Sequence, residues 1–214
     1  MFKAFFKNRQ HAGELLFRKI NKLADEKLMV VAIPNGGVEV VKPIYKNLKN
    51  STFHLVISKK IPLIGAPYIG IGSISNNFEE VNHIRIDTLK LSQKIISQSR
   101  SITKRIIDHK EEFFSSHLLP NNSLYDKDVL LIDDGIASGF TIVAAIKEIK
   151  KLSPRRIIVA APIIYAPTKK IINSMVSDLF YVEASNDKKF VVDKFYEDFD
   201  KVPDERVLNI INEM

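Results

Sequence analysis

Two adjacent carboxylates and a run of small residues follow a short apolar segment in the middle of the chain. Residues 129–132 are Val-Leu-Leu-Ile and lead directly into Asp133 and Asp134, after which comes Gly-Ile-Ala-Ser-Gly-Phe-Thr at 135–141. Small residues let successive backbone N–H groups turn toward one anion, and hydroxyl side chains add further donors. The spacing therefore predicts a phosphate-binding loop, in which the residues at the phosphate are Gly135, Ala137, Ser138, Gly139, Phe140 and Thr141.

The acid pair suits a different part of the same ligand. A carboxylate repels a phosphate, whereas it accepts hydrogen bonds from hydroxyl groups. A phosphorylated sugar carries both kinds of group. Asp-Asp-Gly by itself is typical of a turn after a strand, but the complete run from 129 to 141 favours the phosphosugar site. The run lacks the lysine of a P-loop, and Gly-Ile-Gly at 70–72 does not complete a dinucleotide-binding pattern.

Apolar runs alternate with amphipathic segments along the chain, which predicts a parallel sheet with helices on both faces. Ligands bind such a sheet beyond the carboxyl ends of its strands, where the 133–141 loop would lie. Residues 61–86 are rich in Gly and Pro, so we expect loops with short antiparallel strands there. The expected strands are 28–33, 53–58, 129–132, 157–162, 179–182 and 190–192. The expected helices are 10–27, a segment after 37, 88–118 as one helix or two, 142–151, 167–175 and a segment from 203.

The composition restricts the kinds of site that the protein can have. Cysteine is absent, which excludes disulfides, thiolate nucleophiles and cysteine-ligated metals. The five histidines include no pair at the i, i+4 spacing of a helical metal site. The net charge of +7 is spread along the chain, so we do not expect nucleic acid as a partner. The apolar runs are too short to cross a bilayer and the start lacks a leader pattern, so we expect no membrane contact and a cytoplasmic protein.

The run from 129 to 141 resembles the signature of type I phosphoribosyltransferases at every class-defining position. Further segments are similar to one branch, the bacterial and archaeal predicted phosphoribosyltransferases: Pro-Asn-Gly-Gly at 34–37, Lys59 with Lys60, and Tyr-Glu-Asp-Phe at 196–199. The resemblance implies an α/β fold of the type I phosphoribosyltransferase kind, with a central, mostly parallel sheet, helices on both faces and a small hood. Residues 1–214 would form a single domain, and the N-terminal helix and residues 180–214 would supply the hood or the substrate-specifying parts.

The resemblance also implies a role for each segment. Asp133 and Asp134 would hold the 2- and 3-hydroxyls of a ribose, and residues 137–141 would hold its 5-phosphate. Lys59 or Lys60 would neutralise a leaving pyrophosphate. Mg²⁺ would be bound through the ligand rather than by a dedicated protein cage. The pyrophosphate loop would consist of Asn35, Gly36 and Gly37.

Three positions differ from the family pattern. Asn35 stands where the family usually has Arg, which removes a positive charge that Lys60 is a candidate to replace. Tyr68 stands where the branch tends to carry Glu. Ala137 stands where hypoxanthine and guanine enzymes have Asp, although adenine and orotate enzymes also have Ala, so this difference bears on the substrate. Phe190 resembles the base-stacking residue of the 6-oxopurine enzymes, or else it is a packing residue of an edge strand. The acceptor therefore stays open.

The implied function is that of a glycosyltransferase of nucleotide metabolism. It would move the 5-phosphoribosyl group from Mg-phosphoribosyl pyrophosphate to a nucleobase or similar small nitrogen acceptor, and we expect a homodimer. The alternative is a non-catalytic regulator of the same fold that binds phosphoribosyl pyrophosphate or a nucleotide, and that could also bind nucleic acid through its positive surface. No helix-turn-helix or zinc module in the sequence supports that alternative. We also expect residues 61–86 to form either a mobile lid over the pyrophosphate site or a fixed hairpin packed on the sheet.

Overall fold

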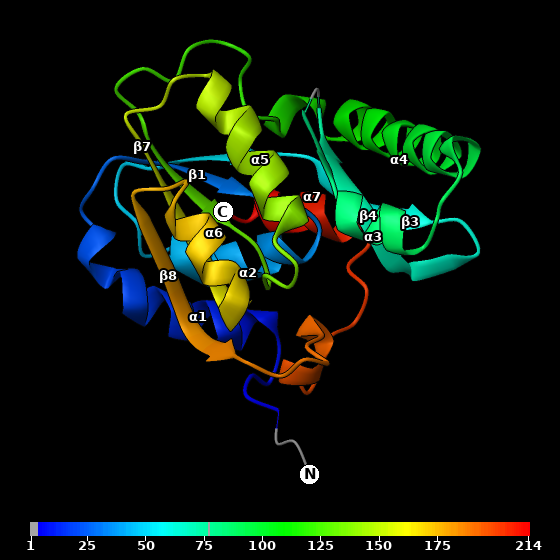
Figure 1. Ribbon diagram of the computed structural model, residues 1–214. Coiled ribbons are helices and arrows are strands. Elements are labelled where there is room, and N and C mark those ends of the chain that lie inside the picture. Colours follow the sequence, from blue (N-terminus) through cyan, green and yellow to red (C-terminus); the bar gives the residue numbers. More distant parts are fainter. Residues whose placement is uncertain (1–3, 77) are drawn as a thin grey trace.

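A five-stranded parallel sheet forms the centre of the computed structural model, which describes residues 4–76 and 78–214 (Figure 1). The strand order is β2-β1-β6-β7-β8, and each neighbouring pair is parallel. The first strand in the chain is therefore an inner strand, next to the central strand that precedes the acid pair. The strands are β1 (Leu28–Ala32), β2 (Thr52–Leu55), β6 (Asp128–Ile132), β7 (Arg156–Tyr165) and β8 (Asp178–Ser185).

Helices cover both faces of this sheet, as expected for strands that are apolar on both sides. Val30 and Leu130 face one layer, which includes α1 (Arg9–Ile20), α2 (Gly36–Tyr45) and α7 (Asp204–Asn212). The next residues of the same strands, Val31 and Leu131, face α5 (Phe140–Lys151) and α6 (Lys169–Asn173). The expected α/β fold is confirmed.

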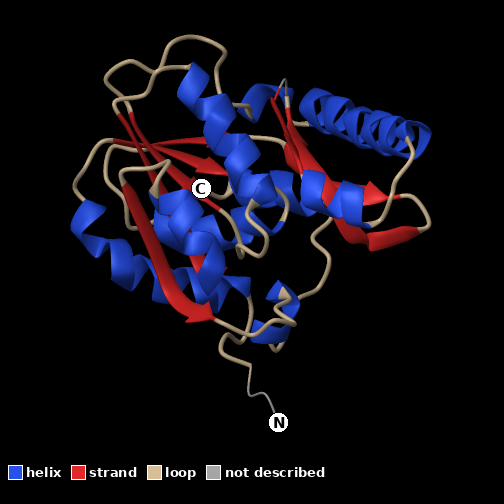
Figure 2. Ribbon diagram, viewed as in Figure 1, coloured by secondary structure: helices blue, strands red, loops and turns tan. Residues whose placement is uncertain are grey.

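A second, antiparallel sheet lies beside the first (Figure 2). It consists of β3 (Ser58–Leu63), β4 (Ala66–Ser75) and β5 (Phe78–Val81), followed by α3 (His83–Thr88) and α4 (Gln93–Phe113). Ile61, Ile71 and Ile74 are buried in the same core as Ile96 and Ile107 of α4. The antiparallel strands expected within 61–86 are confirmed, although α3 at the end of this segment was not expected. The helix expected at 88–118 is shorter and forms α4.

The expected strand 53–58 is wrong in its extent. β2 ends at Leu55, and the chain then crosses from the large sheet to the small one, where β3 begins at Ser58. Neighbouring backbone fixes this crossover, because the N–H of Val56 donates to the carbonyl of Ala32 and the N–H of Leu119 donates to that of Leu55. Lys59 and Lys60 therefore lie within β3 rather than after the second strand.

The expected strand at 190–192 is also wrong. The N–H of Phe190 donates to the carbonyl of Asp187 in a turn, and a short 3-10 helix follows at Val192–Phe195. The turn removes this segment from the sheet despite its β-branched residues. Two helices are shorter than expected: the first becomes a 3-10 turn after Ile20, and α6 begins at Lys169.

The hood remains a prediction. In the structure, α1 packs on α2, and a backbone bridge joins Phe6 to Tyr196, so that the N-terminal segment lies beside the segment that follows β8. Among the helices of the described residues, none is long and apolar enough to span a membrane.

Candidate functional site

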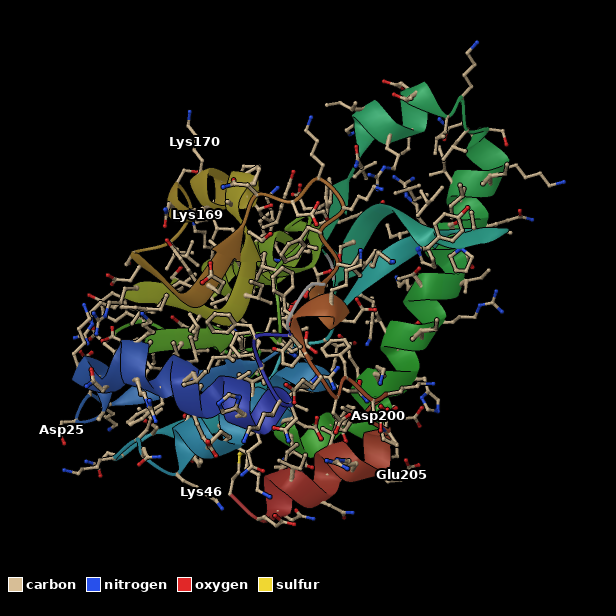
Figure 3. The ribbon with its side chains drawn as sticks, turned by 90° about the horizontal axis from the view of Figure 1, so that it is seen from below. Asp25, Lys46, Lys169, Lys170, Asp200 and Glu205 are labelled. Carbon is tan, nitrogen blue, oxygen red and sulfur yellow. The ribbon has the colours of Figure 1, made fainter. Side chains whose placement is uncertain are left out.

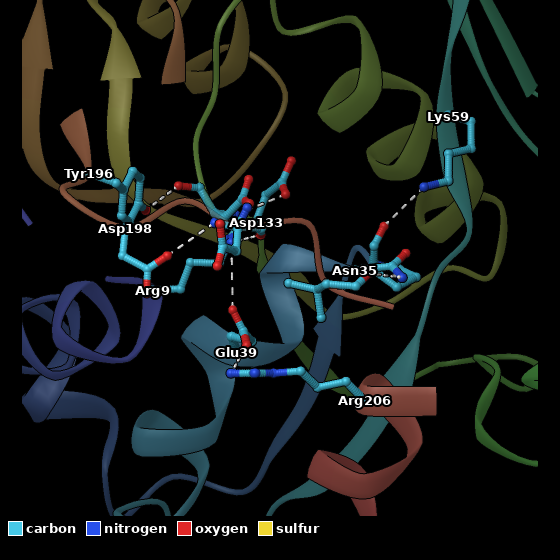
Figure 4. A network of polar contacts seen from close by, with 12 residues as sticks. Arg9, Asn35, Glu39, Lys59, Asp133, Tyr196, Asp198 and Arg206 are labelled. Carbon is cyan, nitrogen blue, oxygen red and sulfur yellow. Dashed lines mark hydrogen bonds and ion pairs between the residues drawn. The ribbon is translucent and has the colours of Figure 1, made fainter. Parts of the chain in front are cut away.

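The polar side chains at the carboxyl edge of the central strands gather around the acid pair (Figure 4). Asp133 and Asp134 follow β6, and Asn35 follows the adjacent β1. Lys59 reaches the same edge from β3, where its Nζ lies 3.5 Å from the carbonyl oxygen of Pro34. The sequence-predicted acids, the 35–37 loop and one of the two lysines are therefore close together.

Gly36 and Gly37 let the start of α2 approach the acids closely. A Cβ atom on Gly36 would lie 1.9 Å from Oδ2 of Asp134, far inside any van der Waals contact. A Cβ on Gly37 would lie 3.0 Å from the carbonyl oxygen of Ile132. Because Gly36 has no side chain, the carboxylate of Asp134 fits against the backbone of this loop. The fold itself therefore requires glycine at position 36.

Arg9, a residue that was not predicted from the sequence, holds Asp134 in place. Its Nε donates to Oδ2 of Asp134 at 2.8 Å and its Nη1 to the carbonyl of Asp200 at 2.8 Å, while its guanidinium lies 3.7 Å from the centre of the Phe199 ring. The Arg9 side chain is 8% exposed and that of Asp134 is 18% exposed. A signal did exist in the sequence, because Arg9 lies on the buried stripe of α1 that continues through Ala12 and Leu16.

Both acids have a pKa above the ordinary value of a carboxyl. For Asp133 the cause is burial, followed by the negative charge of Asp134. Burial also raises the pKa of Asp134, while the charge and the hydrogen bond of Arg9 oppose this effect. The hydroxyl of Tyr196 donates to the carbonyl of Asp134 at 2.6 Å, and the N–H of Asp134 donates to Oδ1 of Asp133 at 2.9 Å. The pair is thus held by hydrogen bonds in a buried site, where changes of charge have large effects.

The loop after the acids ends at the first turn of α5. Gly139 has a φ of +82°, in the left-handed region, and a Cβ there would lie 2.5 Å from Cγ2 of Thr168. The hydroxyl of Thr168 donates to the carbonyl of Ala137 at 2.7 Å, and the hydroxyl of Ser58 donates to that of Thr141 at 2.9 Å. The first N–H groups of a helix have no acceptor within the helix, so this fixed loop presents donors to an anion.

Lys59 and Lys60 point into different cavities, as the alternation of a strand predicts. Lys59 lines a cavity of about 790 Å³ together with Arg9, Asn35 and Gly36. Lys60 is exposed and lines a second cavity, of about 610 Å³, together with Ala137, Ser138, Phe140 and Phe190. Burial, and then the nearby charge of Lys110, lower the pKa of Lys59 to about 8, although the acids around it oppose the shift.

Lys110, which was also not predicted from the sequence, lies against Asn35. Its Nζ donates to Oδ1 of Asn35 at 3.0 Å and to Oδ1 of Asp204 at 2.5 Å. α4 therefore contributes a positive charge beside the 35–37 loop, in addition to Arg9 and Lys59, whereas Lys60 faces the other cavity. The sequence held a signal here too, since Lys110 continues the buried stripe of Thr103 and Ile107 on α4.

Phe190 is a packing residue, although it lies in a turn and not in the expected edge strand, and its role in base stacking stays a prediction. It packs between Tyr165 and Phe195, with ring centres 5.5 Å and 5.2 Å away, and it lines the second cavity. Tyr68 lines the same cavity from the small sheet and is 81% exposed. The second cavity is therefore lined by aromatic rings and is open to solvent at Tyr68.

A phosphoribosyl transferase domain model matches residues 74–198, which is more than half of the chain. The match contains the acid pair and the whole loop to Thr141. The chain belongs to the phosphoribosyl transferase family. The resemblance of the 129–141 run to type I phosphoribosyltransferases is thereby confirmed. The family match begins after Gly37 and Lys60, so the residues expected on the pyrophosphate side of this phosphoribosyl transferase domain lie outside it.

Related proteins agree with this membership. Two strains of Mycobacterium tuberculosis have a relative named "Putative phosphoribosyl transferase", 23% identical over 164 residues. The match covers 74% of this chain and 35% of the relatives, so the chain spans about a third of the length of these curated relatives. Among solved structures, TT1426 from Thermus thermophilus has a TM-score of 0.71 at 23% identity and covers 97% of this chain and 98% of its own. The purine phosphoribosyltransferase from Pyrococcus horikoshii has a TM-score of 0.51 at 16% identity, with 95% and 99% covered. Both share the fold.

Proposed function

We propose that this phosphoribosyl transferase domain binds Mg-phosphoribosyl pyrophosphate across the acid pair and transfers its 5-phosphoribosyl group to a nitrogen acceptor. One observation carries the proposal: Asp133 and Asp134 lie between two sites suited to anions. The loop at 137–141 with the start of α5 follows the acids in the chain, and Gly36, which contacts Asp134, lines the cavity of Lys59 on the other side. A ligand with two anionic ends and a hydroxylated middle matches this order of groups.

The residues suit a reaction in which charges separate. As the bond from C1 of the ribose to the pyrophosphate oxygen breaks, positive charge grows on the ring and negative charge on the leaving group. We assign Asp133 and Asp134 to the hydroxyls of the ring, where their charge stabilises the cationic state. Lys59 stabilises the leaving pyrophosphate. The acceptor nitrogen then attacks C1 from the cavity lined by Phe190 and Tyr165.

Asp133 and Asp134 are suited to a Mg²⁺ ion whose other ligands are the phosphate oxygens of the bound substrate. Within the described residues, no group of three His, Asp or Glu side chains could hold a metal. Mg²⁺ prefers one or two carboxylates together with phosphate oxygens and water, which Asp133 and Asp134 could supply beside the ligand. When bound there, it would add positive charge next to the pyrophosphate.

Pyrophosphate release from phosphoribosyl pyrophosphate, measured with Mg²⁺ across a panel of nucleobases and other nitrogen acceptors, tests the proposal. Acceptor-dependent release with formation of the matching ribosyl 5-phosphate is the expected result. A crystal soaked with ribose 5-phosphate should place the phosphate at the amides of residues 137–141. An occupied site elsewhere, with this loop empty, would contradict the proposal. Tight binding without turnover by any acceptor would favour the non-catalytic regulator, for which the replacement of the family arginine by Asn35 is the supporting observation.

A further inference from the structure

Three side chains from distant parts of the chain meet in the cavity of Lys59. Asn35 follows β1, Lys110 lies near the end of α4, and Asp204 is the first residue of α7. Oδ1 of Asp204 accepts from Nζ of Lys110 at 2.5 Å and from Nδ2 of Asn35 at 2.5 Å. Figure 3 shows how closely the start of α7, near Glu205 and Asp200, approaches the end of α4. The carboxylate of Asp204 thus accepts hydrogen bonds from both donors at this end of the cavity.

The environment of the Asp204 carboxylate is similar to that of an anion bound by a protein. The Lys110 side chain is 11% exposed and that of Asp204 is 24% exposed, so both charges have lost much of their water. Burial alone would raise the pKa of Asp204, but the hydrogen bonds from Lys110 and Asn35 and the charges of Lys110 and Lys59 outweigh it, and the pKa lies below its ordinary value. The donors therefore stabilise negative charge at this point.

The place of Asp204 in α7 bears on what happens when its carboxylate leaves Lys110. Asp204 belongs to the first turn of α7, where the helix dipole stabilises negative charge even when the side chain turns away from Lys110. The rest of α7 is anchored, because Val207 and Ile210 are buried in the core with α2. We therefore expect a rotation of the Asp204 side chain, without movement of the helix, to free the donors.

We propose that Lys110 is a binding residue for the pyrophosphate group, and that the carboxylate of Asp204 occupies this anion site until pyrophosphate displaces it. The inference rests on the proposed function for the identity of the ligand. It assigns to α4 the positive charge that the 35–37 loop itself lacks. It also makes α7 a competitor of the ligand, so that access to the site depends on the start of this helix.

The experiment is isothermal titration of the whole chain with two probes in the presence of Mg²⁺: inorganic pyrophosphate for the anion site and ribose 5-phosphate for the 137–141 loop. Lys110→Met should weaken pyrophosphate binding about tenfold or more, the scale of one charge-assisted hydrogen bond, and Lys110→Arg should retain most of it. Asp204→Asn should strengthen pyrophosphate binding several-fold, since the amide competes less well for Lys110. Binding of ribose 5-phosphate should be unchanged in all three variants.

Lys94→Met is the matched control, because Lys94 is an exposed lysine of the same helix and its loss removes the same charge. Thermal unfolding of each variant verifies that it is folded. Wild-type affinity for pyrophosphate in Lys110→Met, unchanged or weaker binding in Asp204→Asn, or no binding of pyrophosphate to the natural chain would each overturn the inference. Failure to bind ribose 5-phosphate, with the pyrophosphate results as expected, would instead count against the proposed function alone.

Discussion

Nε of Arg9 donates a hydrogen bond of 2.8 Å to Oδ2 of Asp134, although 125 positions separate the two residues in the chain. The pair joins the first helix to the carboxyl end of the central strand β6. It brings positive charge directly behind the acids that we assign to the ribose, so the first helix is part of the candidate site as well as of the fold.

Removal of Arg9 is expected to destabilise the fold. Arg9→Met leaves the carboxylate of Asp134 partly buried without its cation, and breaking one side of such a pair costs about 3 kcal/mol or more. The free energy of unfolding from urea titration measures the loss. Arg9→Met combined with Asp134→Asn should recover a large part of it, because the unpaired charge is then gone. Equal losses in the single and double variants would show that the pair contributes little.

The loss of charge at Asp133 is expected to affect turnover more than binding. Asp133→Asn keeps the shape of the side chain but removes the charge that faces the developing cation, which corresponds to about 2 to 4 kcal/mol of transition-state stabilisation. Steady-state kinetics with an active acceptor should show kcat lowered by about a hundredfold while the affinity for phosphoribosyl pyrophosphate changes little. Unchanged kcat would contradict the role assigned to this acid.

The affinity for phosphoribosyl pyrophosphate is expected to fall as the pH rises through about 8, the pKa of Lys59 in the free protein. Below this pH the lysine is already protonated, while above it each binding event must take up a proton, so affinity decreases by about tenfold per pH unit. The phosphate groups do not produce this change, because the pKa of their second ionisation is about 6 and this ionisation is nearly complete at pH 8. Titrations between pH 7 and 9.5 in buffers of different ionisation enthalpy measure both effects. Lys59→Arg should give a flat profile, and a flat profile in the natural chain would contradict the assignment.

The replacement Gly36→Ala is expected to lower both the stability of the fold and the affinity for the phosphosugar strongly. The new Cβ would lie 1.9 Å from Oδ2 of Asp134 and 2.6 Å from Nε of Arg9, so that the pair must move or the loop must shift. We expect lower thermal stability and weaker binding of the phosphosugar together. Gly65→Ala is the comparison, since its Cβ would meet nothing within 4 Å and only its φ of +83° is unfavourable, at about 1 kcal/mol. A smaller effect at position 36 than at position 65 would be inconsistent with the close approach.

The structure confines the predicted lid to the tip of the β3–β4 hairpin. Ile61, Ile71 and Ile74 are buried in the core, whereas Ile64 is 46% exposed and Tyr68 is 81% exposed. Amide hydrogen exchange should therefore show constant protection at the base of the hairpin. At residues 63–69, exchange should be fast in the free chain and slow with Mg²⁺ and phosphoribosyl pyrophosphate. Strong protection of the tip in both states would show a fixed hairpin.

The sequence predicted those parts of the site that are local in the chain. The acids and the 135–141 loop follow β6 directly, so the apolar run and the small residues could be interpreted together. Arg9 and Lys110 were missed because their partners lie far away in the sequence, and only their places on buried helical stripes marked them. The error at 190–192 has a local cause: β-branched residues favour a strand, but the turn at Asp187 removes this segment from the sheet.

Three consecutive residues of β3 have different neighbours. Ser58 donates a hydrogen bond to the start of α5, Lys59 lines the first cavity and Lys60 lines the second. Because side chains alternate along a strand, inserting or deleting one residue in the crossover at 56–57 would exchange the two lysines between the cavities. Changes of length are therefore tolerable at the exposed hairpin tip and damaging at the crossover. Among natural variants of this chain, insertions and deletions should accumulate between β3 and β4 and be absent between β2 and β3.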